Sequence, residues 1–185
     1  MANPRIAPLD PPYADDIAAG FARVMPPGRE PLNLFRTLAR NPRVLARLFA
    51  GGLLDRGELT PAEREIVILR ACARAGAEYE WGVHVAFFAA RAGLPDATVA
   101  ATVSGVADDP AFDADQRLLV GLVDALHAAA DIDDVLWDTL AARWSEPALI
   151  ELVMLTGQYR MISGLCRTLR LDLEPDAARF PARGY

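Results

Sequence analysis

A carboxylate and an imidazole lie four residues apart in the middle of an apolar stretch of the sequence. The segment 78–84 reads EYEWGVH, which places Glu80 and His84 at positions i and i+4 of a predicted helix. These positions share one helix face, so the two side chains can contact each other. Burial favours their neutral forms, whereas mutual contact favours the ion pair, and together the two effects can leave both groups titrating near neutral pH. Such groups can take and give a proton in catalysis.

Glu65, on the preceding predicted helix, is a second carboxylate with an apolar setting. The segment Thr60–Glu63 has the pattern of a capping box, with proline at the first helical position, and it predicts a helix from Thr60 to Ala75. A helical rotation of about 100° per residue places Glu65 with Leu69 and Cys72 on the apolar face. We therefore expect Glu65, Glu80 and His84 to meet in a common pocket and to be the catalytic residues.

Other interpretations of these residues remain open. A buried glutamate–histidine pair can be a satisfied structural contact, and three converging ligands could hold a metal ion. No HExxH motif or second nearby histidine supports a metal, so we predict none. Cys72 is typical of a small core residue.

Three further residues are candidates for substrate binding: Trp81, Tyr159 and Arg160. Trp81 lies beside Glu80 in the sequence, and Arg160 is a residue type that binds carboxylates through two hydrogen bonds. Tyr159 and Arg160 lie on the last long predicted helix, where packing alone is the simpler role. His127, in DALHAAA, is interpreted as a helix-surface or interface residue.

Composition excludes several classes of function. The net charge is -6, and nucleic-acid binding would need a concentrated positive surface. All basic residues are arginine, which excludes enzymes that depend on a lysine Schiff base or a P-loop lysine. The two cysteines form no CxxC pair, and neither a signal peptide nor a membrane-spanning run is apparent. We expect a cytoplasmic protein without nucleic-acid or membrane partners.

The periodicity predicts an all-α fold of seven or eight helices in one globular domain. Expected helices are Asp15–Val24, Leu32–Leu54 with a joint at Asn41–Pro42, Thr60–Ala75, Ala77–Ala92, and four more opening near Pro95, Asp113, Asp131 and Ser145. We divide the chain into an N-terminal arm and helical extension (1–55), a core (56–172) and a C-terminal tail (173–185). The proline-containing ends are expected to lie on the surface or on a neighbouring subunit.

The stretch TPAEREIVILRACARAGAEYEWGVHVAFFAARAGL resembles the signature region of the carboxymuconolactone decarboxylase family, which shares its fold with alkylhydroperoxidase D (AhpD). The resemblance implies an AhpD-like helical domain with a central hairpin, assembled as a trimer or hexamer. In the peroxidase branch a glutamate, a CxxC pair and a histidine form the active motif. Glu65 and His84 match its ends, whereas Ala77 and Glu80 occupy the two cysteine positions.

Without the dithiol, the resemblance implies the decarboxylase-like branch. We predict a cofactor-free carboxy-lyase acting on a small organic acid or lactone, as in the catabolism of aromatic compounds. In this hypothesis His84 is the general acid, Glu80 its partner and orienter, and Glu65 a more remote carboxylate or proton relay. A non-catalytic helical oligomer of the same fold is the alternative from another class, and a thiol-dependent peroxidase is disfavoured. The apolar content predicts a homo-oligomer.

Overall fold

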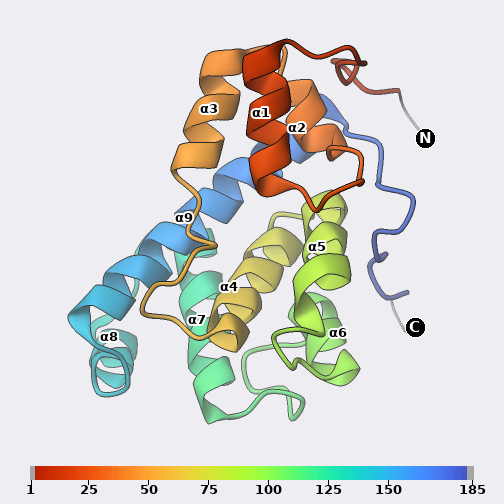
Figure 1. Cartoon of the computed structure of the whole chain (residues 1–185). Coiled ribbons are helices and arrows are strands. Elements are labelled where there is room, and N and C mark those ends of the chain that lie inside the picture. The colour runs from red at the N-terminus through yellow and green to blue at the C-terminus, as the bar shows by residue number, and fades with distance from the viewer. Residues whose placement is uncertain (1–2, 183–185) are drawn as a thin grey trace.

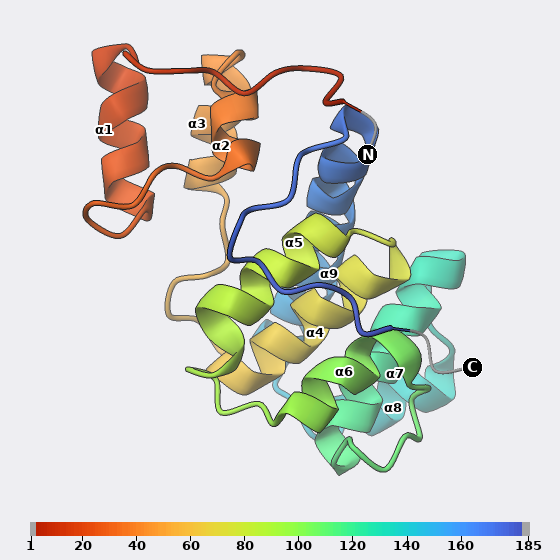
Figure 2. The same ribbon diagram turned by 90° about the vertical axis from the view of Figure 1, so that its right-hand side faces the viewer.

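The chain folds entirely into helices and connecting segments over residues 3–182, the part that the structure, a computed structural model, describes. The elements are α1 (Asp15–Val24), α2 (Asn33–Leu38), α3 (Pro42–Ala50), α4 (Pro61–Arg74), α5 (Glu78–His84), the π-helix η1 (Val85–Ala89), α6 (Asp96–Ser104), α7 (Ala114–Ala129), α8 (Asp134–Ala141) and α9 (Glu146–Leu169). The all-α prediction is confirmed. Figures 1 and 2 show α1, α2 and α3 grouped at one end of α9, apart from the bundle formed by the other helices.

The described residues contain nine α-helices, more than the seven or eight predicted. The additional helix arises within 32–54, where α2 ends at Leu38 and the Asn41 side chain caps α3 by accepting a hydrogen bond from the Val44 amide. Because Pro42 then occupies the first turn of α3, one expected helix becomes two short ones.

Most predicted helix starts are confirmed by capping hydrogen bonds. Thr60 and Asp113 form complete capping boxes, and the Ser145 side chain accepts from the Ala148 amide. The predicted cap at Asp131 is wrong, because Asp133 accepts from the Leu136 amide and opens α8. An N-cap aspartate accepts from the amide of the third helical residue. In α8 that residue is Leu136, so Asp133 is the cap.

Helix α4 lies at the centre of the bundle and packs against α5, α6, α7 and α9. Its residues from Glu65 to Cys72 are all buried, including Arg70, which the helical rotation places on the side away from Glu65. The Arg70 guanidinium binds both carboxylate oxygens of Asp124 at 2.6 and 2.7 Å and donates to the carbonyl oxygens of Thr102 and Gly105. A paired arginine can therefore occupy a core position.

The helix predicted from Ala77 to Ala92 is interrupted at His84. Helix α5 ends there, and the chain continues as the π-helix η1. Such segments place one extra residue in a turn and so reset the direction of the side chains that follow. His84 is thus the last residue of the regular helix, with its ring against that of Phe88 at a centroid distance of 5.0 Å.

The C-terminal segment covers α5 within the same chain (Figure 2). The Tyr79 hydroxyl donates to Glu174 at 2.5 Å, and the Ala178 amide donates to the Gly82 carbonyl at 3.3 Å. At the other end of the chain, the Arg5 amide donates to the Leu169 carbonyl. Both expected terminal segments therefore lie on their own chain over the described residues; residues 1–2 and 183–185 fall outside them. No helix in the described part is long and apolar enough to span a membrane.

Candidate active site

His84 is held by a carboxylate from the neighbouring helix. Its Nδ1 atom lies 2.8 Å from Glu65 Oε2, and both side chains are buried, so α4 and the end of α5 fix the ring together. With Glu65 ionised, Nδ1 carries a proton and donates it in a hydrogen bond, which leaves Nε2 as the nitrogen that exchanges protons.

Glu80 approaches the other ring nitrogen. Its Oε1 atom lies 3.7 Å from His84 Nε2, one turn earlier on α5, and its Oε2 atom accepts a hydrogen bond from the Cys166 thiol at 3.9 Å. Burial raises the pKa of Glu80, and the Glu65 carboxylate adds to this effect, while His84 and Cys166 oppose it.

The geometry therefore reverses the arrangement expected for the two glutamates. Glu65, expected to be the more remote group, makes the short hydrogen bond that orients His84, and Glu80, the expected orienter, stands at a longer distance. The i, i+4 spacing identifies a neighbour on the same helix, but a side chain from an adjacent helix can approach an imidazole nitrogen more directly. All three predicted catalytic residues nonetheless lie in one buried cluster.

Helix α9 also contributes buried side chains to this cluster. Tyr159, Ser163 and Cys166 are buried along one stripe of the helix, and the Tyr159 ring meets that of His84 edge-on at 4.9 Å. Cys72 also belongs to the cluster: burial raises the pKa of the Cys72 and Cys166 thiols, and the Glu80 carboxylate raises both further. Sequence reasoning missed Cys166 and Ser163. The i, i+4, i+7 spacing of polar residues on the apolar side of α9 is the signal that indicates them.

Two oxygen atoms in the cluster are incompletely satisfied. Within residues 3–182, neither Glu65 Oε1 nor Ser163 Oγ has a hydrogen-bond partner, and Arg64 Nε lies 3.9 Å from Glu65 Oε1. Buried polar atoms are normally paired, so such atoms need a specific explanation.

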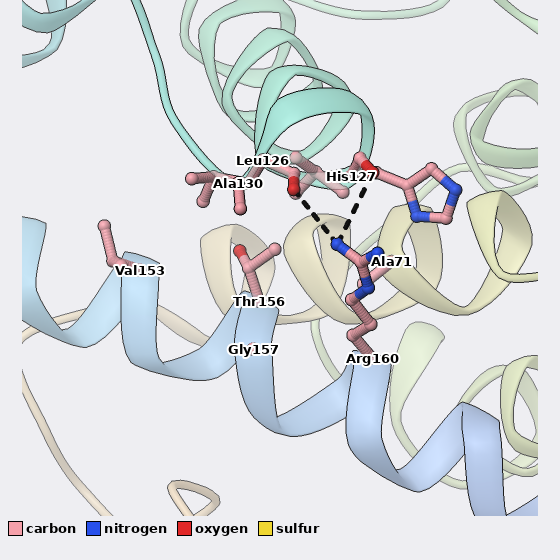
Figure 3. A pocket seen from close by; sticks show the side chains of 9 residues that line it. Ala71, Leu126, His127, Ala130, Val153, Thr156, Gly157 and Arg160 are labelled. Atoms are coloured by element: carbon pink, nitrogen blue, oxygen red, sulfur yellow. Dashed lines mark hydrogen bonds between the residues drawn. The ribbon is translucent and has the colours of Figure 1, made fainter.

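The other two predicted substrate-binding residues lie away from His84. The Trp81 indole donates to Thr102 Oγ1 at 2.9 Å and packs edge-on against Phe180, so its contacts are with α6 and the C-terminal segment. Arg160 donates to the carbonyl oxygens of Leu126 and His127 in a pocket between α7 and α9 (Figure 3). Of the three, only Tyr159 contacts the cluster. Over the described residues, no group of three or more His, Cys, Asp or Glu side chains is arranged to hold a metal ion.

The fold of the chain is similar to those of several solved protein structures. A peroxidase-related protein of Ralstonia eutropha JMP134 with an AhpD core superposes with a TM-score of 0.80 over 95% of both chains at 18% identity. A peroxidase-related protein of Silicibacter sp. TM1040 gives a TM-score of 0.81, at 19% identity, over 98% of this chain and 100% of that one. The debrominase Bmp8, in complex with 2,3,4-tribromopyrrole, gives 0.74 over 94% of both chains at 20% identity. These similarities establish an AhpD-like fold.

Part of the sequence also matches a known family. Residues 42–122 match the model of the carboxymuconolactone decarboxylase family, and this region carries Glu65, Cys72, Glu80 and His84. The resemblance inferred from the signature stretch is thus confirmed for the part of the chain that contains the α4–α5 hairpin. No protein of curated function matches the sequence.

Proposed function

We propose that the protein is a cofactor-free lyase that decarboxylates a small organic acid or lactone at the Glu65–His84–Glu80 cluster. The family match over 42–122 supports a catalytic role. The observation that carries the proposal is the buried imidazole with Nδ1 bound to Glu65 and Nε2 directed to Glu80. This arrangement fixes the ring and provides one nitrogen for proton transfer.

The reaction needs a proton donor at a defined place. The carbon–carbon bond to the leaving carboxylate breaks, carbon dioxide departs, and the electron pair passes into the conjugated system of the substrate as an enolate. With Nδ1–H held by Glu65, His84 acts as the acid when Nε2 also carries a proton. This second proton adds to carbon and leaves the ring neutral, a proton from the Glu80 carboxyl restores Nε2–H, and water reprotonates Glu80. A buried site favours this loss of charge from the substrate carboxylate.

The incompletely paired oxygens favour catalysis over a purely structural cluster. If Glu65, Glu80 and His84 served packing alone, each buried polar atom would be expected to have a partner. Glu65 Oε1 makes no hydrogen bond among the described residues, and its ionic contact with Arg64 Nε is long, at 3.9 Å. A substrate group or a proton in transit is a natural partner for this oxygen.

The test is carbon dioxide release from a panel of lactone acids and acids of aromatic catabolism. We expect His84→Ala and Glu80→Gln each to lower kcat by about 10²- to 10⁴-fold, the usual contribution of a positioned acid or base. Their double variant should lose less than the product of the two, because groups that act as a unit are not additive. Circular dichroism serves as the folding control. Near-normal turnover in both folded single variants would show that the cluster is structural.

The two thiols make a thiol-dependent oxidoreductase the second candidate. The Cys166 thiol donates to Glu80, Cys72 is buried on α4, and the structural relatives include peroxidase-related proteins and a debrominase. However, a thiolate is the reactive form of cysteine, and burial with a neighbouring carboxylate raises the pKa of both thiols.

We therefore expect Cys72→Ala and Cys166→Ser to keep the lyase activity. Serine at 166 retains a donor to Glu80, so the polar contact survives without the sulfur. The assay pairs carbon dioxide release with peroxide consumption in the presence of a thiol reductant. Peroxide turnover that disappears in either variant would replace the lyase proposal with the thiol mechanism.

A further inference from the structure

A second pocket, on the other side of α9 from the His84 cluster, is strongly basic. It has a volume of ≈ 480 Å³, and Arg74, His127, Arg160 and Arg167 are among its lining residues. This volume lies in the range of small-molecule sites. The concentration of positive charge contrasts with the net charge of -6 of the whole chain.

The positive charge in this pocket is largely uncompensated. Within residues 3–182 no carboxylate forms a salt bridge with Arg160 or Arg167, and Asp124, which lies 3.4 Å from Arg74, already binds Arg70 through both oxygens. Each of the two unpaired guanidinium groups is instead anchored by Nη1 to backbone carbonyls, at 2.7 Å for Arg167 to Ala75. Their remaining N–H groups are available for an anionic ligand.

Burial and the neighbouring arginines both act on the pKa of His127. Burial lowers its pKa, and Arg160 and Arg74 lower it further, while Asp124 opposes them. A neutral imidazole at this place can donate or accept a hydrogen bond without adding charge.

An apolar pocket adjoins the basic one and shares Arg160 and His127 with it (Figure 3). Its volume is ≈ 170 Å³, and Ala71, Val123 and Val153 contribute to its apolar wall. A ligand that occupied both pockets would thus need a compact apolar part beside an anionic group.

Helix α9 separates these pockets from the catalytic cluster. Tyr159 and Cys166 face the cluster, whereas Arg160 and Arg167, one residue further along in each case, face the basic pocket. Ser163 lines the basic pocket and is fully buried, and its hydroxyl oxygen has no hydrogen-bond partner within residues 3–182.

We propose that the joined pockets, here called the Arg160 trough, bind a small amphipathic carboxylic acid, with the carboxylate between Arg160 and Arg167 and the apolar body against Val123 and Val153. The trough is a ligand site separate from the His84 cluster, so the inference goes beyond the proposed function. Its occupancy does not depend on the reaction at His84.

Isothermal titration calorimetry on the full chain tests the site, with benzoate as the probe. We expect benzoate to bind at one site per chain, and its neutral isostere benzamide to bind at least about tenfold more weakly, because a charge-assisted hydrogen bond is lost. Inorganic phosphate, which has no apolar part, should also bind more weakly than benzoate.

Variants locate the bound acid. Arg160→Gln and Arg167→Gln should each raise the Kd for benzoate by about tenfold or more. Arg117→Gln, an exposed arginine near the other end of α7, is the matched control and should leave it unchanged. Thermal melting of each variant checks that it folds. Because the two arginines are replaced separately, the test still holds if one of the variants fails to fold.

His84→Ala separates this proposal from the proposed function, because it should lower kcat by about 10²- to 10⁴-fold and keep the Kd for benzoate. Absence of benzoate binding, or binding that neither arginine variant weakens, would overturn the trough as an acid site. Equal affinity for phosphate and benzoate would do the same, since it would mean that the apolar pocket is unused. Loss of benzoate binding in folded His84→Ala would place the acid in the catalytic cluster instead.

Discussion

Glu80 is the carboxylate of the cluster that lies one turn before His84 on α5. It stands where the peroxidase branch of the resembled family has its second cysteine, and it contacts both His84 and Cys166. A thiol at this position would support redox chemistry, whereas a carboxyl supports proton transfer. Because burial raises its pKa, Glu80 can hold a proton at a pH at which an exposed glutamate has lost it.

The same shift predicts how stability depends on pH. A carboxyl whose pKa is higher in the folded than in the unfolded state binds more protons when folded, so it favours folding at low pH. The contribution is complete below the ordinary glutamate pKa and is lost as pH rises through the raised pKa of Glu80. We expect Glu80→Gln to flatten the pH dependence of Tm between the ordinary glutamate pKa and the raised pKa of Glu80. A Tm profile identical to that of wild type would contradict a raised pKa, and Glu63→Gln, outside the cluster, is the control.

At the scale of elements, local signals predict where helices begin better than which faces meet. Thr60 and Asp113 cap their own helices, so a few adjacent residues determine the start. The burial of Arg70 depends instead on Asp124, which is 54 residues away in the chain. No periodicity within α4 contains that information.

The contacts within the cluster also divide into local ones, which the sequence predicts, and long-range ones, which it does not. Glu80 and His84 could be predicted to be neighbours because the helix repeat brings them together, and the rotation of α4 placed Glu65 on the correct face. The contact between Cys166 and Glu80 joins residues 86 positions apart and depends on how α9 packs. Arg160 could not be assigned for the same reason: it follows Tyr159 directly, but a turn of about 100° directs it to α7 instead of His84.

Gly82 couples α5 to the C-terminal segment and gives an element-scale prediction. A Cβ atom at this position would lie 2.2 Å from the Ala178 carbonyl oxygen, so the two backbones can approach only with glycine. We expect Gly82→Ala to lower the free energy of unfolding by about 1–3 kcal/mol, as overpacking usually does. The segment that carries Ala178 should also detach, and tryptic cleavage after Arg179 should become faster.

Gly121→Ala in α7 is the matched control, because nothing lies within 4 Å of its added Cβ atom. Alanine there should be neutral or stabilise the protein by up to about 1 kcal/mol, since it is the better helix former. Urea denaturation measures both variants. If Gly82→Ala were as stable as wild type, with unchanged tryptic cleavage, the close approach of the C-terminal segment to α5 would be refuted.

At the scale of the whole molecule, α9 carries an apolar face that the chain itself leaves exposed. Ile150, Met154 and Met161 are 71%, 59% and 55% exposed, and their spacing of four and seven residues places them on one side of the helix. An apolar helix face that the chain itself leaves exposed suits packing against another copy of the chain.

We therefore predict a homo-oligomer, a trimer or hexamer as the family resemblance implies, in which α9 contributes to the interface. Sedimentation at micromolar concentration measures it: the wild type should sediment as the oligomer, and the double variant Met154→Lys with Met161→Lys should shift toward the monomer, because two charges would have to be desolvated in an apolar contact. Val106→Lys, at an exposed apolar position between α6 and α7, is the control and should not dissociate it. A monomeric wild type would refute the assembly. An oligomer that resists the double lysine variant would place the interface on another face, and the exposed methionines of α9 would then need a different partner.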